Sequence, residues 1–316
     1  MSEKILILDA NSILYRAFYA LPKLTTSTGK PINAVYGFLL VLFRVIKEFS
    51  PDYIFICFDF PAKTFRHQLF KEYKSKRPPT PDDLKIQIPI LKEILKTFSI
   101  PFYEKEGFEA DDIIGTITKQ IAELQNSRSK VQNEKDLEII IVSGDLDALQ
   151  LVVPQIKVYV LQRGVKDIVL YDENLVKEKF QGLAPEQILD FKALRGDPSD
   201  NIPGVSGIGE KTAINLLLQF KNLENLYKEI EENSQAAQKL SQKLKGILLK
   251  QKEQAFLSKD LAKIEKNVPL EFNLIKWNFQ ETHQEKVKNI LLKYGFKSLI
   301  KKLPEIKKQI NNGRLF

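Results

Sequence analysis

The sequence predicts an α/β fold in which helices flank a mainly parallel central sheet, followed by an all-helical region. Short apolar runs such as "KILILD" at residues 4–9 do not alternate with polar residues, which is typical of strands buried on both faces of a parallel sheet. Segments with helical periodicity separate these runs, as in βαβ units. From about residue 174 the periodicity indicates helices alone. We therefore expect a first domain over residues 1–174 and a helical domain over residues 175–316.

The predicted strands of the first domain end in acidic residues. The first run ends at Asp9, the run "YIFICFDF" reaches Asp59, and the run "EIIIVSGDLD" leads to Asp145 and Asp147. The run "IKVYVL" predicts a further strand.

Helical periodicity predicts the elements between these strands. It covers residues 34–49, residues 84–98 with a break or kink at Pro89, and the apolar stretch after "EADD". The polar stretch at residues 125–138 is expected to form a mobile surface loop.

The second domain is expected to consist of helices. "PEQILDFKALRG" has a proline at its start and Gly196 at its end, as a capped helix does. Residues 204–220 form a glycine-rich turn that leads into a helix. Residues 235–265 indicate a solvated amphipathic helix, and residues 284–293 a further helix.

Composition indicates a soluble globular protein. Of 316 residues, 43% are hydrophobic and 28% charged, and no apolar run approaches the ~20 residues of a membrane span. The N-terminus has no signal-peptide pattern, so the cytoplasm is the simplest compartment. Cys57 is the only cysteine, which excludes a disulfide and a cysteine-based zinc site. A net charge of +8 suits a polyanionic partner such as nucleic acid.

The acids after the strands are expected to lie together. In an open parallel sheet, ligands bind beyond the carboxyl ends of the strands, where Asp9, Asp59 and Asp145 belong. The stretch "GFEADDIIG" adds acids at the start of a helix that is expected to face the same cleft. A single Asp after a strand is usually a turn residue or a helix cap. Repetition of the pattern at every core strand favours a shared function.

Such a cluster needs positive charge. Two carboxylates about 4 Å apart repel by roughly 4 kcal/mol at an effective dielectric of 20, and several such pairs approach the stability of a domain. Protons or cations must therefore neutralise the acids, and divalent metals are favoured at neutral pH. Carboxylates select Mg²⁺ or Mn²⁺, and His67 and His283 are too few for an imidazole-based zinc site. Two such ions ~4 Å apart are the usual apparatus of phosphodiester hydrolysis.

A basic segment follows Asp59. Residues 63–77 carry six Lys and Arg residues, and Phe65, Phe70 and Tyr73 are interleaved among them. Basic side chains contact phosphates and aromatic rings stack on bases. The alternative is an exposed amphipathic helix with its aromatic residues on the core. The position after an acidic strand end favours contact with a nucleic acid.

A glycine turn follows two further acids in "RGDPSDNIPGVSGIGEKTA". Glycines let backbone amides approach a phosphate, and the dipole of the following helix favours an anion. The turn lacks the Lys-Ser/Thr ending of a nucleotide-binding loop and does not follow a strand. Its residues of interest are Asp197, Asp200, Gly204, Gly207, Gly209 and Lys211.

Taken together, these segments resemble the 5′-nuclease, or flap-endonuclease, family. Within it they are most similar to the 5′→3′ exonuclease domain at the N-terminus of bacterial DNA polymerase I. The resemblance covers about residues 4–220 and implies a PIN-like, resolvase-like nuclease core. The motifs that carry it are, in chain order, "ILDANSILYRAF", "AVYGF", "FDFPAKTFRHQLFKEYKSKRPPTPDDL", "GFEADDIIGT", "VSGDLDALQL" and "LRGDPSDNIPGVSGIGEKTA".

The resemblance implies roles for individual residues. A helical arch over residues 63–85 would pass the 5′ strand, and Arg66 and Lys74 would position or polarise the scissile phosphate. A helix–three-turn–helix at about residues 186–220 would grip duplex DNA, often with K⁺. Asp112 would act on an ion through water or cap its helix. The metal-binding acids would be Asp9, Asp59, Glu109, Asp111, Asp112, Asp145, Asp147, Asp197 and Asp200. The DNA-binding residues would be Arg16, Tyr73, Arg77, Gly204, Gly207, Gly209 and Lys211.

We therefore expect a monomeric, structure-specific nuclease with two Mg²⁺ or Mn²⁺ ions. It would act on DNA with 5′ flaps, nicks or free 5′ ends, RNA primers among them, in primer removal and repair. A separate polymerase is a candidate partner, because the sequence ends at Phe316 without a polymerase segment. The alternatives are the N-terminal part of such a polymerase, a related metal ribonuclease and a non-catalytic binder of DNA junctions.

Overall fold

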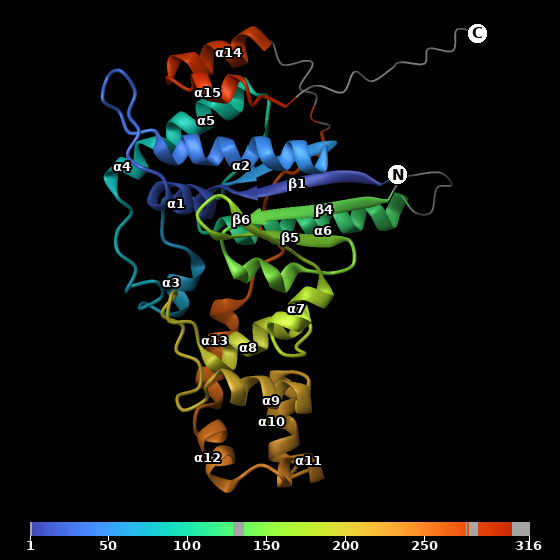
Figure 1. The fold of residues 1–316 in the computed structure, drawn as a ribbon. Helices are drawn as coiled ribbons and strands as arrows, with labels where there is room; N and C mark the ends of the chain where they lie inside the picture. The colour runs from blue at the N-terminus through green and yellow to red at the C-terminus, as the bar shows by residue number, and fades with distance from the viewer. Residues whose placement is uncertain (1, 129–135, 276, 278–283, 305–316) are drawn as a thin grey trace, which may run out of the picture.

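The computed structural model describes residues 2–128, 136–275, 277 and 284–304. Within these residues, six strands form one sheet in the order β3-β2-β1-β4-β5-β6, and only β6 runs antiparallel to its neighbour (Figure 1). The predicted mainly parallel sheet is thus confirmed. The strands are β1 (Glu3–Asp9), β2 (Tyr53–Cys57), β3 (Phe102–Tyr103), β4 (Leu137–Ser143), β5 (Ile156–Arg163) and β6 (Asp167–Tyr171).

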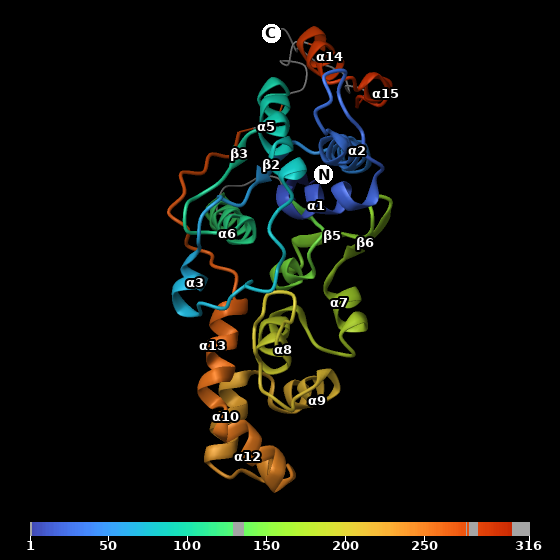
Figure 2. The same cartoon turned by 90° about the vertical axis from the view of Figure 1, so that its left-hand side faces the viewer.

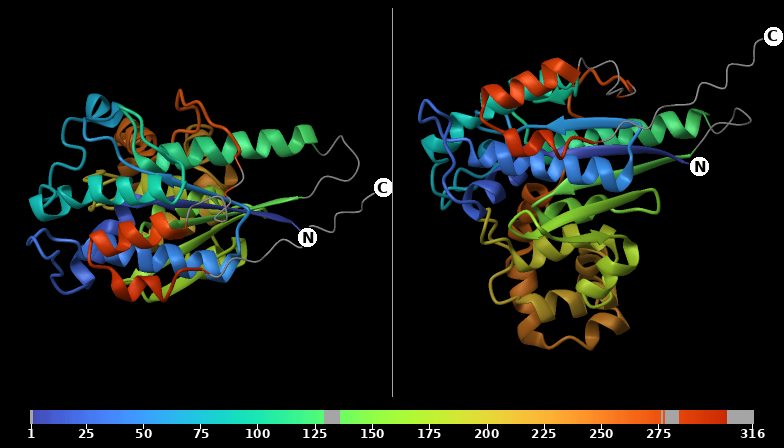
Figure 3. Two further views of the ribbon diagram at one scale, coloured as in Figure 1. Left: turned by 90° about the horizontal axis from the view of Figure 1, so that it is seen from above. Right: turned by 45° about the horizontal axis from the view of Figure 1, so that its top comes forward.

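Helices cover both faces of this sheet, so that each central strand is buried on both sides. Leu6 and Leu8 of β1 pack on one face with α1, α2 and α5, whereas Ile5 and Ile7 pack on the other face with α6 (Figure 3). The unalternating apolar runs follow from this double burial. The helices of this part are α1 (Ala10–Ala20), α2 (Asn33–Phe49), α3 (Phe65–Leu69), α4 (Asp82–Lys85), α5 (Gln87–Thr97), α6 (Ala110–Arg128) and the 3₁₀ helix η1 (Leu146–Leu151).

Two sequence-based boundaries differ in the structure. The helix expected over residues 84–98 divides at Ile86 into α4 and α5, and Pro89 lies in the first turn of α5, where a missing N–H is tolerated. The loop expected at residues 125–138 begins later, because α6 continues to Arg128. Residues 129–135 of that loop lie outside the described residues.

The chain after β6 is helical, as expected. Pro185 begins a 3₁₀ turn, and Gly196, with φ of 79°, ends α8. The single helix expected over residues 235–265 is three helices. The side chains of Ser234 and Ser241 cap the first two, and Gln251, with φ of −114°, separates the second from the third. The elements are α7 (Glu173–Lys179), η2 (Pro185–Gln187), α8 (Ile188–Arg195), α9 (Glu210–Phe220), α10 (Leu223–Glu231), α11 (Gln235–Gln238), α12 (Gln242–Lys250), α13 (Lys252–Ala262), α14 (Gln284–Lys293) and α15 (Lys297–Ile300).

The last helices return to the sheet instead of extending the helical region. Leu291 of α14 is buried in the same core as α2 and α5, and Phe272 packs edge-on against Phe55 of β2. Figures 1 and 2 show α14 beside α5, and α14 and α15 at the opposite end of the molecule from α9 to α12. The expected placement of these helices with residues 175–316 therefore differs from the structure. The boundary near residue 174 stays a prediction.

No helix among the described residues is long and apolar enough to cross a membrane.

Candidate active site

The acids that follow the strands lie at one edge of the sheet. Asp9 ends β1, Asp59 follows β2 by two residues, and Asp145 follows β4 by two residues. These strands are adjacent, and the strand order reverses at β1 and β4, which is where open α/β sheets bind ligands. The side chain of Asp9 accepts from the Ser143 hydroxyl at 2.8 Å, and that of Asp59 accepts from the Ala110 amide at 2.8 Å.

Two of these acids also cap helices, which is the usual role of a single Asp after a strand. Asp9 caps α1 by accepting from the Ser12 amide at 3.1 Å. Asp145 caps η1 by accepting from the Asp147 amide at 3.0 Å. One oxygen of each carboxylate is thus fixed by a backbone amide, which orients the rest of the group.

The acids at the start of α6 differ from one another. Asp112 is fully buried, and its two oxygens accept from the guanidinium of Arg66 at 2.8 and 2.7 Å. The same oxygens accept from the amides of Glu109 at 3.1 Å and Glu265 at 2.8 Å. Of the two roles expected for Asp112, capping is the one that these contacts support. By contrast, the buried Oδ1 of Asp111 has no hydrogen-bond partner among the described residues.

Arg66 was expected to contact a phosphate, but its side chain lies inside the protein. The residue is 1% exposed, and besides Asp112 it donates to the carbonyls of Leu261 at 2.9 Å and Lys263 at 2.7 Å. A guanidinium suits this position because its planar fork supplies several donors at once. The donors that a DNA phosphate would need are engaged inside the protein.

Two other expected DNA contacts also point inward. Tyr73 is 3% exposed, and its hydroxyl lies 3.1 Å from both Glu109 Oε2 and Asp200 Oδ2, so its ring is not presented for stacking. Arg16 donates from Nε to the Gly144 carbonyl at 3.0 Å and so braces the end of β4.

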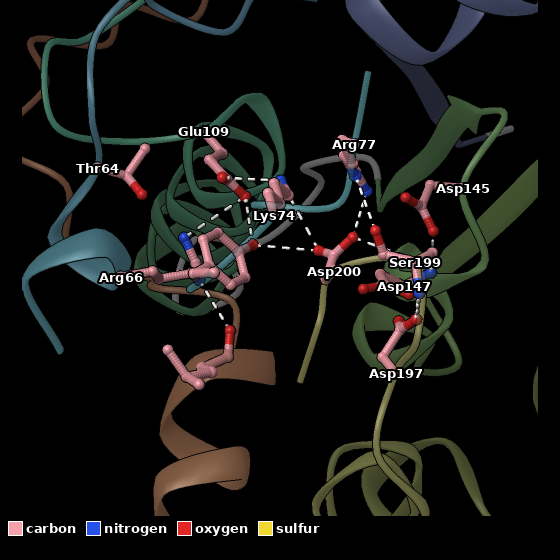
Figure 4. Close-up of polar contacts among 12 residues, drawn as sticks. Thr64, Arg66, Lys74, Arg77, Glu109, Asp145, Asp147, Asp197, Ser199 and Asp200 are labelled. Carbon is pink, nitrogen blue, oxygen red and sulfur yellow. Dashed lines mark hydrogen bonds and ion pairs between the residues drawn. The ribbon is translucent and has the colours of Figure 1, made fainter. Parts of the chain in front are cut away.

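Besides Arg66, three cations lie among the acids, and Figure 4 labels two of them, Lys74 and Arg77. Lys74 Nζ is 2.8 Å from Glu109 Oε1 and 3.7 Å from Asp200 Oδ2, and Arg77 pairs with Asp200. Lys192 of α8 pairs with Asp147 and lies 2.7 Å from Asp197 Oδ2.

Sequence reasoning missed Lys192. Its only signal was a basic residue five positions before Asp197, in a helix that also carries Arg195, and such residues are common.

The acids remain short of positive charge despite these cations. Burial raises the pKa of Asp9 and of Asp111, and neighbouring carboxylates add to both shifts. Although solvent reaches Asp59, the surrounding protein and the charge of Asp9 raise its pKa to about 6. Burial raises the pKa of Asp147 to about 7, although Lys192 opposes the shift. Burial would also raise the pKa of Asp197, but Lys192 outweighs it and lowers that pKa to about 2.

The donor set fits a hard divalent cation in its chemistry. All candidate ligands are carboxylates, and both the unpartnered oxygen of Asp111 and the raised pKa values indicate a deficit of positive charge. In the part of the chain that the structure describes, no three His, Cys, Asp or Glu side chains are yet gathered to hold a metal ion. The ammonium groups of Lys74 and Lys192 lie between the acids instead.

The two halves of the glycine turn differ. The half around Gly204 packs against the protein, and the half with Gly207 and Gly209 is open to solvent. Gly204 has φ of 62°, and a Cβ there would lie 2.3 Å from the Gly196 nitrogen. Gly204 also donates its N–H to the Ser258 hydroxyl at 3.0 Å. Gly207 and Gly209 are exposed, and Gly209 precedes α9, whose first turn carries the exposed Lys211. Only this second half can meet a ligand.

The segment over residues 63–85 is not one helical arch. It consists of α3 and α4, joined by turns over residues 71–76 and an irregular stretch over residues 77–81 (Figure 1). Pro78, Pro79 and Pro81 lie in this connection, and proline disfavours the helical conformation of the residue before it.

Comparison with protein families gives two adjoining matches. Residues 4–181 match the model of the 5′-3′ exonuclease N-terminal resolvase-like domain. Residues 183–285 match the model of the 5′-3′ exonuclease C-terminal SAM fold. The two models together span both the sheet and the helical region.

Similar proteins were found among curated sequences. A DNA polymerase I of Bacillus caldotenax is 42% identical over 303 residues, which cover 96% of this chain and 32% of that protein. A 5′-3′ exonuclease of Aquifex aeolicus is 38% identical over 310 residues, which cover 98% of both proteins. The chain thus spans about a third of the length of the polymerases that it matches.

Solved structures share the fold. A bacteriophage T5 flap endonuclease, in a pseudo-enzyme–product complex with DNA and metal ions, has a TM-score of 0.65 and 21% identity over 92% of this chain and 99% of that one. The catalytic core of Rad2 in complex with a DNA substrate has a TM-score of 0.58 and 15% identity over 93% of this chain and 88% of that one. At these identities the likeness concerns the fold alone.

Proposed function

The chain belongs to the 5′-3′ exonuclease family, and on that premise we propose that it hydrolyses phosphodiester bonds in DNA that carries a free 5′ end, a nick or a 5′ flap. The cut falls near the junction of single strand and duplex and leaves a 5′-phosphate. One observation carries the proposal: acids from β1, β2, β4, α6 and the turn after α8 share one edge of the sheet, and several have a raised pKa.

Two Mg²⁺ or Mn²⁺ ions are the proposed cofactors. When bound, such ions supply an activated water for attack and stabilise the leaving oxygen. Asp112 is assigned to holding the start of α6, because protein donors engage both of its oxygens. The proposed ligands are Asp9, Asp59, Glu109, Asp111, Asp145, Asp147, Asp197 and Asp200.

Lys74 and Arg77 are the proposed contacts to the scissile phosphate. Both lie among the acids, and both remain partly open to solvent. A cation held at that place stabilises negative charge that develops during the reaction. Arg66, which was expected to share this role, is assigned to holding α3 and α6 together.

The open half of the glycine turn is the proposed contact to the downstream duplex. Gly207, Gly209 and Lys211 present backbone amides and a positive charge beside the N-terminus of α9. A K⁺ ion at this turn belongs to the proposal. Because phosphate contacts dominate such a grip, binding is expected to weaken steeply with salt.

The biological setting is also a proposal. Primer removal and DNA repair, a working partnership with a DNA polymerase and tolerance of RNA primers suit an activity on 5′ ends. A monomer in the cytoplasm remains the expected form.

The proposal is tested by cleavage of end-labelled flap, nicked and blunt duplexes with Mg²⁺ and with EDTA. We expect metal-dependent products at the junction of the flap substrate. Tight binding without any product would favour the non-catalytic junction binder. An RNA strand of the same sequence is tested in parallel, and products from RNA alone would favour the ribonuclease alternative.

A further inference from the structure

Lys74 has an unusual backbone conformation. Its φ is 55°, in the left-handed region that side chains with a Cβ rarely adopt. Three residues on, the Arg77 amide closes a turn on the Lys74 carbonyl, at 3.0 Å. Contacts from elsewhere in the chain must therefore stabilise this conformation.

Those contacts come from the turn after α8. The Lys74 amide donates to the Asp200 carbonyl at 2.8 Å. The side-chain amide of Asn201 donates to the Glu72 carbonyl at 2.8 Å and lies 3.3 Å from the Ser75 hydroxyl. Asn201 therefore holds the chain on both sides of Lys74.

The direction of the Lys74 side chain depends on this arrangement. Its ammonium lies 2.8 Å from Glu109 Oε1 and 3.7 Å from Asp200 Oδ2. With an ordinary negative φ, the side chain would leave the turn in another direction. We propose that Asn201 is a positioning residue, which holds Lys74 in the left-handed conformation that aims its ammonium into the acidic site.

The competing explanation is a simple brace. Next to Asn201, Ile202 is buried with Tyr73 and Leu261, so the basic segment already packs on the helical region. If Asn201 only adds to that packing, its loss weakens the whole contact between the basic segment and the helical region. If it positions Lys74, its effect on the reaction disappears when the Lys74 side chain is absent.

The test compares two asparagines that share a backbone conformation. Asn201→Gly removes the side-chain amide but keeps a residue that adopts positive φ freely. Asn233→Gly is the matched control, because Asn233 is exposed, has φ of 50° and lies in the loop after α10. Each change is made in the wild-type protein and in Lys74→Ala.

The first readout is the single-turnover cleavage rate of a 5′-flap DNA with Mg²⁺, which rests on the proposed function. Asn201→Gly should lower this rate about tenfold, the size expected for the loss of one or two hydrogen bonds. In the Lys74→Ala protein the same change should have less than about a twofold effect. Asn233→Gly should have no effect in either protein. An equal loss with and without Lys74, or a loss confined to DNA affinity, would overturn the proposal.

The second readout does not need nuclease activity. Trypsin cleaves after lysine only where the chain opens locally, so the rate of cleavage after Lys74 reports on the turn. In the protein without DNA or metal, Asn201→Gly should raise this rate about tenfold at an unchanged melting temperature. An unchanged rate contradicts the inference even if the protein proves to cleave no DNA, and that second result would count against the proposed function alone.

Discussion

Arg66 shows how one buried residue can hold three parts of the chain together. It extends from α3, pairs with Asp112 of α6 and donates to the carbonyls of Leu261 and Lys263 around the end of α13. A buried charge is tolerated only when its donors are satisfied. The start of α6, which carries Glu109 and Asp111, is therefore held by this residue.

Arg66→Lys should destabilise the protein although it keeps the charge. A lysine ammonium cannot reproduce the fork to Asp112 and the two carbonyl contacts, so we expect a loss of about 2–4 kcal/mol in the free energy of unfolding. Urea denaturation measures it. Arg44→Lys is the control, because the Arg44 side chain is 45% exposed, and we expect a change of under about 0.5 kcal/mol. Equal effects at both positions would refute the structural role of Arg66.

Among individual residues, the acids of the site could be predicted from the sequence, but the side chains that contact them could not. Asp9, Asp59 and Asp145 follow from the ends of buried strands, which a short sequence window reveals. Tyr73 and Arg66 turn inward because of partners 127 and 195 residues away along the chain. No local pattern contains that information, so an aromatic residue among basic ones could not be told from a base-stacking residue.

In the glycine turn, the structure predicts different effects of the same substitution at Gly204 and at Gly209. Gly204 has positive φ and no room for a Cβ, whereas Gly209 has φ of −90° and nothing within 4 Å of the Cβ position. Gly204→Ala should lower the free energy of unfolding by about 2–4 kcal/mol, and Gly209→Ala by less than about 1 kcal/mol. Thermal unfolding followed by circular dichroism measures both. A Gly204→Ala protein as stable as the Gly209→Ala protein would contradict the packing described.

The elements were predictable where periodicity alone decides them. Strands β1, β2, β4 and β5 and the helices over residues 34–49 and 284–293 were expected from pattern. The short β3 and the antiparallel β6 were not expected. The division of residues 235–265 into three helices depends on the cap at Ser241 and on an interruption at Gln251, which the apolar stripe does not reveal. A helical arch over residues 63–85 was expected from the resemblance, whereas the prolines between α3 and α4 favour turns over a continuous helix.

At the scale of the whole molecule, the chain crosses between its two parts more than once. After α13 it returns to the sheet, where Phe272 packs on Phe55, and α14 packs on α5. Arg66 joins the first part to the chain around Lys263. The boundary predicted near residue 174 is therefore not a place where the chain would separate into two independent parts.

A fragment of residues 1–174 should accordingly be much less stable than the full chain. It would expose the apolar surface that Phe272, Leu291 and Phe296 cover, and it would leave donors of Arg66 without partners. We expect a loss of cooperative unfolding or a fall in melting temperature of at least about 10 °C. Calorimetry of the fragment and the full chain tests this. An equal melting temperature would show that residues 1–174 fold independently.

The central claim is that the acidic edge of the sheet is a metal-dependent catalytic centre. The most direct measurement is single-turnover cleavage of a 5′-flap DNA by the wild-type and Asp145→Asn proteins, with binding measured in parallel. Asparagine keeps an oxygen that can cap η1, so the fold should persist. The account predicts that the variant binds the flap within about threefold of wild type and cleaves it more than about 100-fold more slowly. Unchanged cleavage by Asp145→Asn would contradict it.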